Sequence, residues 1–173
     1  MSVSGSEQAD DEQYRLALGR AMDILAVREH SAWQLRRKLE RKFSQAVAAR
    51  VLERLEELEL LDDARFAREY VRQRIARSPR SSRLLMSELI SRGVERATAA
   101  GAVEFILEEK GLQDLDLAEQ AAAKKLGALF ESRRSRSLAE KNKEREKMFR
   151  FLAGRGFQAS TARQVIDKLL GSP

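Results

Sequence analysis

The sequence predicts an all-α protein built from three tandem three-helix repeats. Apolar residues recur at steps of three and four along most of the 173 residues, and only two prolines interrupt them. The same apolar pattern returns after about 50 residues and then once more. A repeat of this length buries too little apolar surface alone, so neighbouring repeats stack on one another. We therefore expect an elongated, curved helical array.

Composition narrows the class of protein. Apolar residues make up 43% of the chain and charged residues 35%, a balance typical of a soluble, folded, helix-rich protein. There is no cysteine, which excludes disulfides and thiolate metal sites. The N-terminus is not a signal peptide, and no uncharged apolar run is long enough for a membrane helix. We expect a cytoplasmic protein, and its net charge of +6 favours nucleic acid or an acidic surface as partner.

The first repeat is predicted at residues 13–61, after a flexible tail at residues 1–12. Its first helix begins near Tyr14. Ser31 and Ser44 each precede an apolar stripe, so their hydroxyls can cap the second and third helices.

The second repeat is predicted at residues 62–113. It opens with Asp62 and Asp63, whose carboxylates can cap the helix whose apolar stripe begins at Phe66. Gly93 follows the second helix of this repeat, where a left-handed residue commonly ends a helix. These residues form the predicted seam between repeats.

The third repeat is predicted at residues 114–173. Gly156 takes the place that Gly93 holds in the second repeat, and we include it among the seam residues. A basic insertion around residues 130–147 separates the first two helices. It either extends the flanking helices or forms a basic loop.

No catalytic constellation is visible, so we expect a protein that is not an enzyme and holds no cofactor or metal. His30 is the only histidine, and we expect it to be solvated in a loop. Residues 154–156 lack the Gly-Lys-Ser/Thr ending of a phosphate-binding loop.

Charge is sorted by helix position. The third helices of the first two repeats are acidic, whereas the second helix of the first repeat and the start of the second repeat are rich in arginine. Guanidinium groups bind phosphates and carboxylates bidentately, so these residues are candidates for contact with DNA or a protein partner. The candidates are Arg36, Arg37, Lys38, Arg41, Arg72, Arg74, Arg77, Arg80, Arg83, Arg133 and Arg134.

The aromatic residues are expected to pack in the core. Those at inward periodic positions are Phe66, Tyr70, Phe105, Phe149 and Phe157. Trp33 fits two interpretations, a core anchor between repeats, which we expect, or an exposed interaction hot spot.

Four segments together resemble the RecX family of bacterial regulators of the RecA recombinase. They are residues 31–39 (SAWQLRRKL), 61–67 (LDDARFA), 88–94 (ELISRGV) and 150–157 (RFLAGRGF). The resemblance extends over about residues 14–170. One departure is Lys42, where the family often has glycine, so this turn has either a strained Lys42 or a shortened form.

The resemblance implies a non-enzymatic regulator that binds RecA and its filament on DNA. Such a protein would limit filament growth and damp the ATPase, strand-exchange and coprotease activities, in recombinational repair and the SOS response. Its array would lie in the filament groove and contact RecA, single- or double-stranded DNA, or both. We expect a monomer.

Two other functions are compatible with the residues. The protein could be a helix-turn-helix-like DNA-binding module that acts independently of RecA, which would require tight, salt-dependent binding to bare DNA. It could also be a helical scaffold whose basic residues only keep it soluble, in which case reversing their charge would leave every interaction intact.

Overall fold

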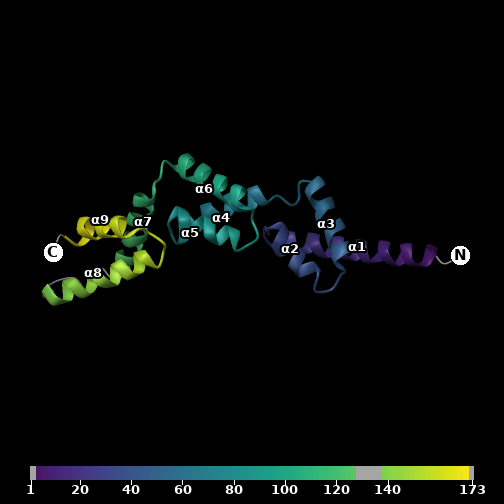
Figure 1. The fold of residues 1–173 in the computed structure, drawn as a ribbon, viewed down its shortest axis with the longest axis horizontal. Helices are drawn as coiled ribbons and strands as arrows, with labels where there is room; N and C mark the ends of the chain where they lie inside the picture. Colours follow the sequence, from purple (N-terminus) through teal and green to yellow (C-terminus); the bar gives the residue numbers. More distant parts are fainter. Residues whose placement is uncertain (1–2, 128–137, 172–173) are drawn as a thin grey trace. The chain divides into compact units, whose positions relative to one another are not determined.

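The structure is a computed structural model that describes residues 3–127 and 138–171. These residues form nine α-helices and no strand (Figure 1), which confirms the all-α prediction. The helices follow one another in three groups of three, as the repeated apolar pattern predicts.

The first group contains α1 (Val3–Val27), α2 (Ala32–Leu39) and α3 (Gln45–Glu57), and each of the three helices contacts the other two. Helix α1 begins well before the predicted start, so most of residues 1–12 is helical rather than an irregular tail. This part of α1 is polar and has no apolar stripe to reveal it in the sequence.

The core of the first group is made by small and branched apolar side chains. It contains Ala17, Ala21, Leu35, Leu39, Val47, Ala48, Val51, Leu52, Leu55 and Leu61. Both predicted serine caps are confirmed: the Ser31 Oγ accepts a hydrogen bond from Gln34 N at 3.2 Å, and the Ser44 Oγ accepts one from Val47 N at 3.3 Å.

The second group contains α4 (Asp63–Arg77), α5 (Ser82–Ile90) and α6 (Arg96–Lys110). Helix α4 ends two residues before Pro79, which is buried in the loop to α5. A proline cannot donate the backbone hydrogen bond that would continue the helix, and it disfavours the helical conformation in the residue before it.

The third group contains α7 (Asp114–Gly127), α8 (Leu138–Ala153) and α9 (Ala159–Leu170), again in mutual contact. Of the predicted insertion, residues 138–147 form the first turns of α8. The remainder, with Arg133 and Arg134, lies outside the described residues.

By its internal contacts the chain forms two compact units. One consists of residues 1–67 and 89–99, and the other of residues 68–88 and 100–173. The seam at Asp62 and Asp63 therefore lies inside the first unit, and all three helices of the second repeat are divided between the units. The division into three domains stays a prediction.

The turn after the second helix differs between the first two repeats. After α5, Val94 N bonds to Leu89 O at 3.2 Å across the left-handed Gly93, whose φ is 83°. After α2, Phe43 N bonds to Leu39 O at 3.0 Å, so this hydrogen bond closes a turn that is one residue shorter than the turn after α5. The first turn is thus shortened, and Lys42 is not left-handed. Of the two forms considered for this turn, the shortened one is confirmed.

The shorter turn moves the register of the third helix by one residue. Buried Ala48 of α3 therefore corresponds to buried Ala99 of α6, 51 rather than 50 positions later. One consequence corrects the sequence analysis: Phe105 is 52% exposed, and Ile106 takes the core position instead. Phe66 and Phe157 are buried as predicted.

Candidate interaction surface and repeat junctions

A hydrogen-bonded junction joins the first repeat to the second. It consists of Ser31, Ala32, Asp63, Arg92 and Gly93. Ala32 N, in the first turn of α2, donates to the Asp63 Oδ1 at 2.8 Å, and the Ser31 Oγ donates to Arg92 O at 2.5 Å. The start of α2 is therefore held by groups that the next repeat supplies.

The two adjacent aspartates have different roles. The Asp62 Oδ1 accepts hydrogen bonds from Ala64 N at 2.8 Å and Arg65 N at 3.0 Å, so Asp62 caps α4 as predicted. Asp63 reaches across the junction instead. Burial raises the pKa of the Asp63 carboxyl above its usual value, the hydrogen bond from Ala32 opposes the rise, and the charge of Asp62 adds to it.

The second junction repeats the first. It consists of Ser81, Ser82, Asp114, Arg155 and Gly156. Ser82 N donates to the Asp114 Oδ1 at 2.8 Å, and Ser81 N donates to Arg155 O at 3.0 Å. The sequence analysis missed Asp114, although it lies 51 positions after Asp63 and could have been found from that spacing.

A left-handed glycine lies against the preceding repeat in each junction. A Cβ on Gly93 would be 2.2 Å from the Trp33 Cβ, and one on Gly156 would be 2.5 Å from the Ser81 Oγ. Both glycines have φ of 83°. Backbone conformation and lack of space therefore both require glycine. The sequence analysis predicted the left-handed conformation but not the lack of space.

Trp33 combines the two interpretations that the sequence left open. It packs against the backbone of Gly93, so it anchors the junction, yet it remains 41% exposed. The Arg37 guanidinium lies over its ring, with the Cζ 4.8 Å from the ring centroid. The expectation of a core tryptophan is therefore only half right.

His30 is buried, with 3% of its surface exposed, so the expectation of a solvated histidine is wrong. Its Nδ1 lies 2.9 Å from Arg28 O, and its Nε2 lies 2.8 Å from the Lys38 Nζ. These partners fit the neutral ring, with Nδ1–H donating and Nε2 accepting. Burial lowers the pKa of His30, the Arg28 hydrogen bond opposes the effect, and the charges of Arg28 and Lys38 reinforce it.

Three of the candidate arginines are held in ion pairs within the second unit. Arg72 pairs with Glu109 at 3.0 Å, and Arg74 and Arg80 both pair with Glu88. The Glu88 Oε2 also accepts a hydrogen bond from the hydroxyl of Tyr70 at 2.6 Å. These contacts tie α4 and its following loop to α5 and α6, so the three arginines have a structural role.

Arg155 is a further cation, close to Arg80, that the sequence analysis did not select as a candidate. Its guanidinium stacks on Phe151 with 3.9 Å from Cζ to the ring centroid, and its Nη2 donates to the Ser78 Oγ at 3.3 Å. Burial lowers the pKa of Arg155, and the charge of Arg80 lowers it further. Phe151 and Ser78 hold Arg155 over the second junction.

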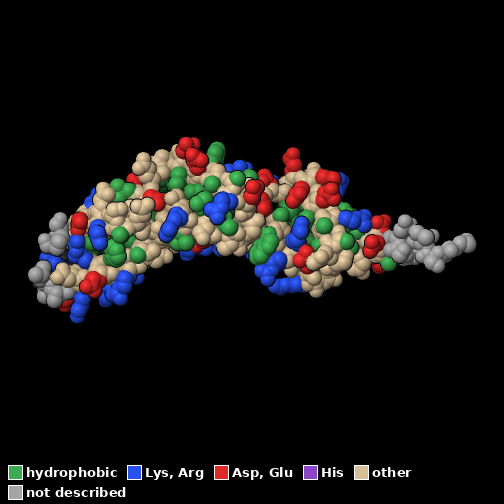
Figure 2. Space-filling model, viewed as in Figure 1, with side chains coloured by type: hydrophobic (Ala, Val, Ile, Leu, Met, Phe, Trp, Pro, Cys, Tyr) green, Lys and Arg blue, Asp and Glu red, His purple; other side chains and the backbone are tan. Residues whose placement is uncertain are grey.

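Other candidate cations are exposed and have no ion-pair or hydrogen-bond partner among the described residues. They are Arg36, Arg41, Arg77 and Arg83, together with neighbouring Lys42. On the face shown in Figure 2, basic side chains gather beside α2 and acidic ones over α3. Arg36, Arg41 and Lys42 also lie at or just beyond the C-terminal end of α2, where positive charge stabilises a helix.

Within residues 3–127 and 138–171 there is no cluster of side chains suited to a metal ion. In the same part of the chain, none of the helices combines the length and the apolar character that crossing a bilayer requires.

The cost of crowding the first junction can be measured with two glycine variants. Gly93 and Gly111 are both left-handed, but a Cβ on Gly111 would meet no atom within 4 Å. Gly111→Ala should cost about 1–2 kcal/mol of unfolding free energy from the backbone alone. Gly93→Ala should cost about 1–3 kcal/mol more, because Trp33 must move. Equal costs in urea unfolding would contradict the packing described for Trp33.

The hydrogen bond across the first junction predicts a contrast at Asp63. Asp63→Ala leaves Ala32 N without its acceptor and should cost about 1–3 kcal/mol. Asp63→Asn keeps an acceptor oxygen and avoids burying a charge, so its unfolding free energy at pH 7 should stay within about 0.5 kcal/mol of the parent. If both variants lose the same stability in urea unfolding, the negative charge matters rather than the hydrogen bond.

His30 predicts a loss of stability on mild acidification. Its pKa is lower in the folded than in the unfolded chain, so the unfolded chain binds more protons near pH 6. The contribution of His30 to the unfolding free energy is therefore fully present above about pH 6.5, and it decreases as the pH falls through that value. Urea unfolding between pH 7.5 and 5.5 should show this fall. In His30→Gln, whose amide oxygen can still accept from Lys38, the fall should be absent; an identical fall would exclude His30 as its source.

Comparison with known proteins places these features in a family. Residues 17–55 match the model of the first three-helix domain of RecX, and residues 62–103 match that of the second. Both aspartates of the predicted seam, Asp62 and Asp63, lie at the start of the second match.

Relatives match along nearly the whole chain. A regulatory protein RecX from Prosthecochloris aestuarii is 38% identical over 92% of this chain and 97% of its own length. A regulatory protein RecX from Chlorobium phaeobacteroides is 33% identical over 94% of this chain and 99% of its own length.

Two solved structures have the same fold. The crystal structure of RecX from Lactobacillus salivarius superposes with a TM-score of 0.68 at 16% identity, covering 92% of this chain and 97% of that one. The crystal structure of another regulatory protein RecX superposes with a TM-score of 0.71 at 21% identity, covering 94% of this chain and 75% of that one. With two domain models and full-length relatives in agreement, this chain belongs to the RecX family of regulatory proteins.

Proposed function

We propose that this protein binds the filament of RecA on single-stranded DNA and limits its growth, and thereby its ATPase, strand-exchange and coprotease activities. The observation that carries the proposal is the match to regulatory RecX proteins over almost the full length of both chains. The regulatory role comes with the family, and RecA as its target is the proposal.

Regulation of this kind requires binding rather than chemistry. A protein that occupies a filament surface raises the cost of adding or rearranging subunits there, and it needs no catalytic group to do so. Tandem repeats suit this task because they offer several contact surfaces on one chain, and weak contacts made together give high affinity.

The exposed cations without partners are the best candidates for contact with the filament. Four of them, Arg36 on α2, Arg41 just after α2, Arg77 at the end of α4 and Arg83 on α5, can bind phosphate or carboxylate without first breaking an ion pair. By contrast, Arg72 and the other paired arginines of α4 would have to give up a carboxylate. Contact with about four DNA phosphates would lower log K by roughly 3 per tenfold rise in salt.

Acidic third helices argue against the alternative of an independent helix-turn-helix-like reader of DNA. In the comparable three-helix DNA-binding domains, the third helix enters the major groove. Here α3 carries exposed Glu53, Glu56 and Glu57, and α6 carries exposed Glu104 and Glu108. These carboxylates would repel the phosphates on either side of the groove.

The proposal predicts the effect of reversing charge beside α2. Arg36→Glu combined with Arg41→Glu should raise the protein concentration needed for half-inhibition of RecA ATPase on single-stranded DNA by about tenfold or more. Both side chains are exposed, so the fold should survive, and thermal unfolding followed by circular dichroism will check this.

The matched control is Arg15→Glu combined with Arg20→Glu, which makes the same change of charge at exposed positions of α1. It should inhibit as the parent does. If the parent itself neither inhibits ATPase nor shortens filaments, RecA is not the target. Binding of all three proteins to bare single-stranded DNA then separates contact with DNA from contact with RecA.

A further inference from the structure

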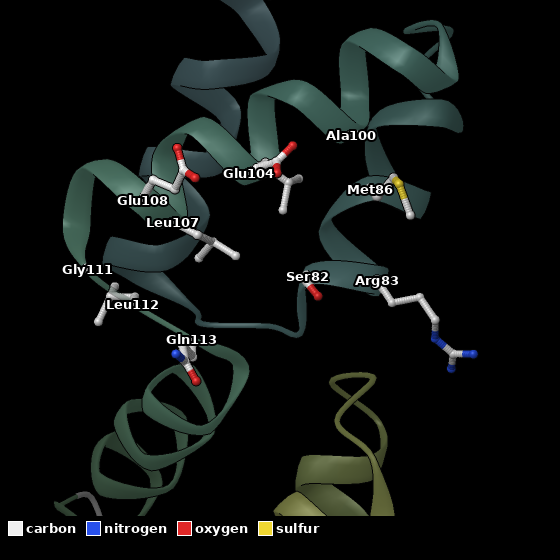
Figure 3. Close-up of a pocket in the computed structure, with 11 residues that line it drawn as sticks. Ser82, Arg83, Met86, Ala100, Glu104, Leu107, Glu108, Gly111, Leu112 and Gln113 are labelled. Atoms are coloured by element: carbon white, nitrogen blue, oxygen red, sulfur yellow. The ribbon is translucent and has the colours of Figure 1, made fainter.

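A groove with an apolar floor lies between α5 and α6 in the second unit (Figure 3). Its volume is about 630 Å³. Met86 on α5 and Leu107 on α6 both line it, and Ala100, Val103 and Leu112 complete the apolar lining. Apart from buried Val103, these side chains are only half-buried, so contact with a partner would remove further apolar surface from water.

One rim of this α5–α6 groove is acidic. Glu104 and Glu108 stand on α6 above the apolar floor, one helical turn apart, and both are exposed. Neither forms an ion pair with another described residue, whereas neighbouring Glu109 is paired with Arg72 at 3.0 Å. On the opposite wall the Arg83 side chain points away from the groove. The groove therefore offers two unpaired carboxylates beside an apolar floor.

The first repeat does not have the same lining. The second helices of the two repeats correspond at an offset of 50 residues and the third helices at an offset of 51. Met86 therefore corresponds to Arg36 and Leu107 to Glu56, and both of these charged residues are exposed. Two apolar side chains of the second repeat are thus charged in the first, although both repeats form the same three helices. The apolar character is not required by the repeat fold, which indicates that it serves contact with something else.

We infer that the α5–α6 groove binds a segment of RecA in which an apolar side chain is flanked by lysine or arginine. The apolar side chain enters between Met86 and Leu107, and the basic side chains pair with Glu104 and Glu108. These glutamates are separated by one turn, roughly 6 Å along the axis, so a partner helix with basic residues four positions apart would match them. The groove itself indicates the chemistry of the bound segment. That the segment belongs to RecA rests on the proposed function.

Charge reversal tests the rim. Glu104→Lys combined with Glu108→Lys should raise the Kd for RecA filaments on single-stranded DNA by about tenfold, measured by co-sedimentation titration. The matched control is Glu53→Lys combined with Glu57→Lys, at the corresponding exposed positions of α3. It adds the same positive charge and should leave the Kd within about twofold of the parent, because the exposed Arg54–Glu57 pair contributes little.

Leu107→Ser tests the floor without a change of charge. It should raise the Kd by about fivefold, mainly through faster dissociation. Thermal unfolding by circular dichroism will establish that each variant is folded.

The outcomes separate the two proposals. If the parent does not bind the filament, both the proposed function and this inference are overturned. If the parent binds and the α6 and α3 reversals have equal effects, or Leu107→Ser binds as the parent does, only the groove is excluded as the site.

Discussion

The fold depends on how the first backbone N–H groups of α2 and α5 are satisfied. A helix leaves four such donors without a partner inside it, and a serine cap satisfies one. In both junctions the following repeat supplies a second acceptor, Asp63 for Ala32 N and Asp114 for Ser82 N. The second helix of each of these repeats is therefore completed by its neighbour. This explains why the first seam lies inside a compact unit rather than at its edge.

The left-handed glycines follow from the same constraint. For Asp63 to reach α2, the next repeat must approach closely, and its helix-ending turn then meets the preceding repeat at Trp33 or Ser81. Only glycine fits there. The turn of the first repeat at Lys42 closes one residue sooner and contains no left-handed residue, so glycine is not required there. The departure of Lys42 from the family pattern thus has a physical reason.

Helix periodicity and capping residues were sufficient to predict the helices, their repetition and the role of Asp62. They were not sufficient where partners are distant in sequence. Apolar spacing of three and four tolerates a slip of one residue, which is why Phe105 was expected in the core although Ile106 lies there. The pairing of Arg72 with Glu109, 37 residues apart, depends on helices that only the fold brings together. The burial of His30 was likewise missed, because a lone histidine carries no periodic signal. The α5–α6 groove is invisible in sequence because half-buried Met86 and Leu107 look like ordinary core residues.

If the protein binds a filament as proposed, the differences between its repeats bear on how it does so. The first repeat carries unpaired cations beside α2 and charged residues at the groove positions, whereas the second carries an apolar groove with unpaired carboxylates. A filament presents the same subunit surface again and again. Repeats that each bound the same site on successive subunits would need the same chemistry, and Arg36 and Met86 do not have it. The difference favours unlike contacts, with each repeat binding a different part of the filament, so that the loss of one contact cannot be replaced by another.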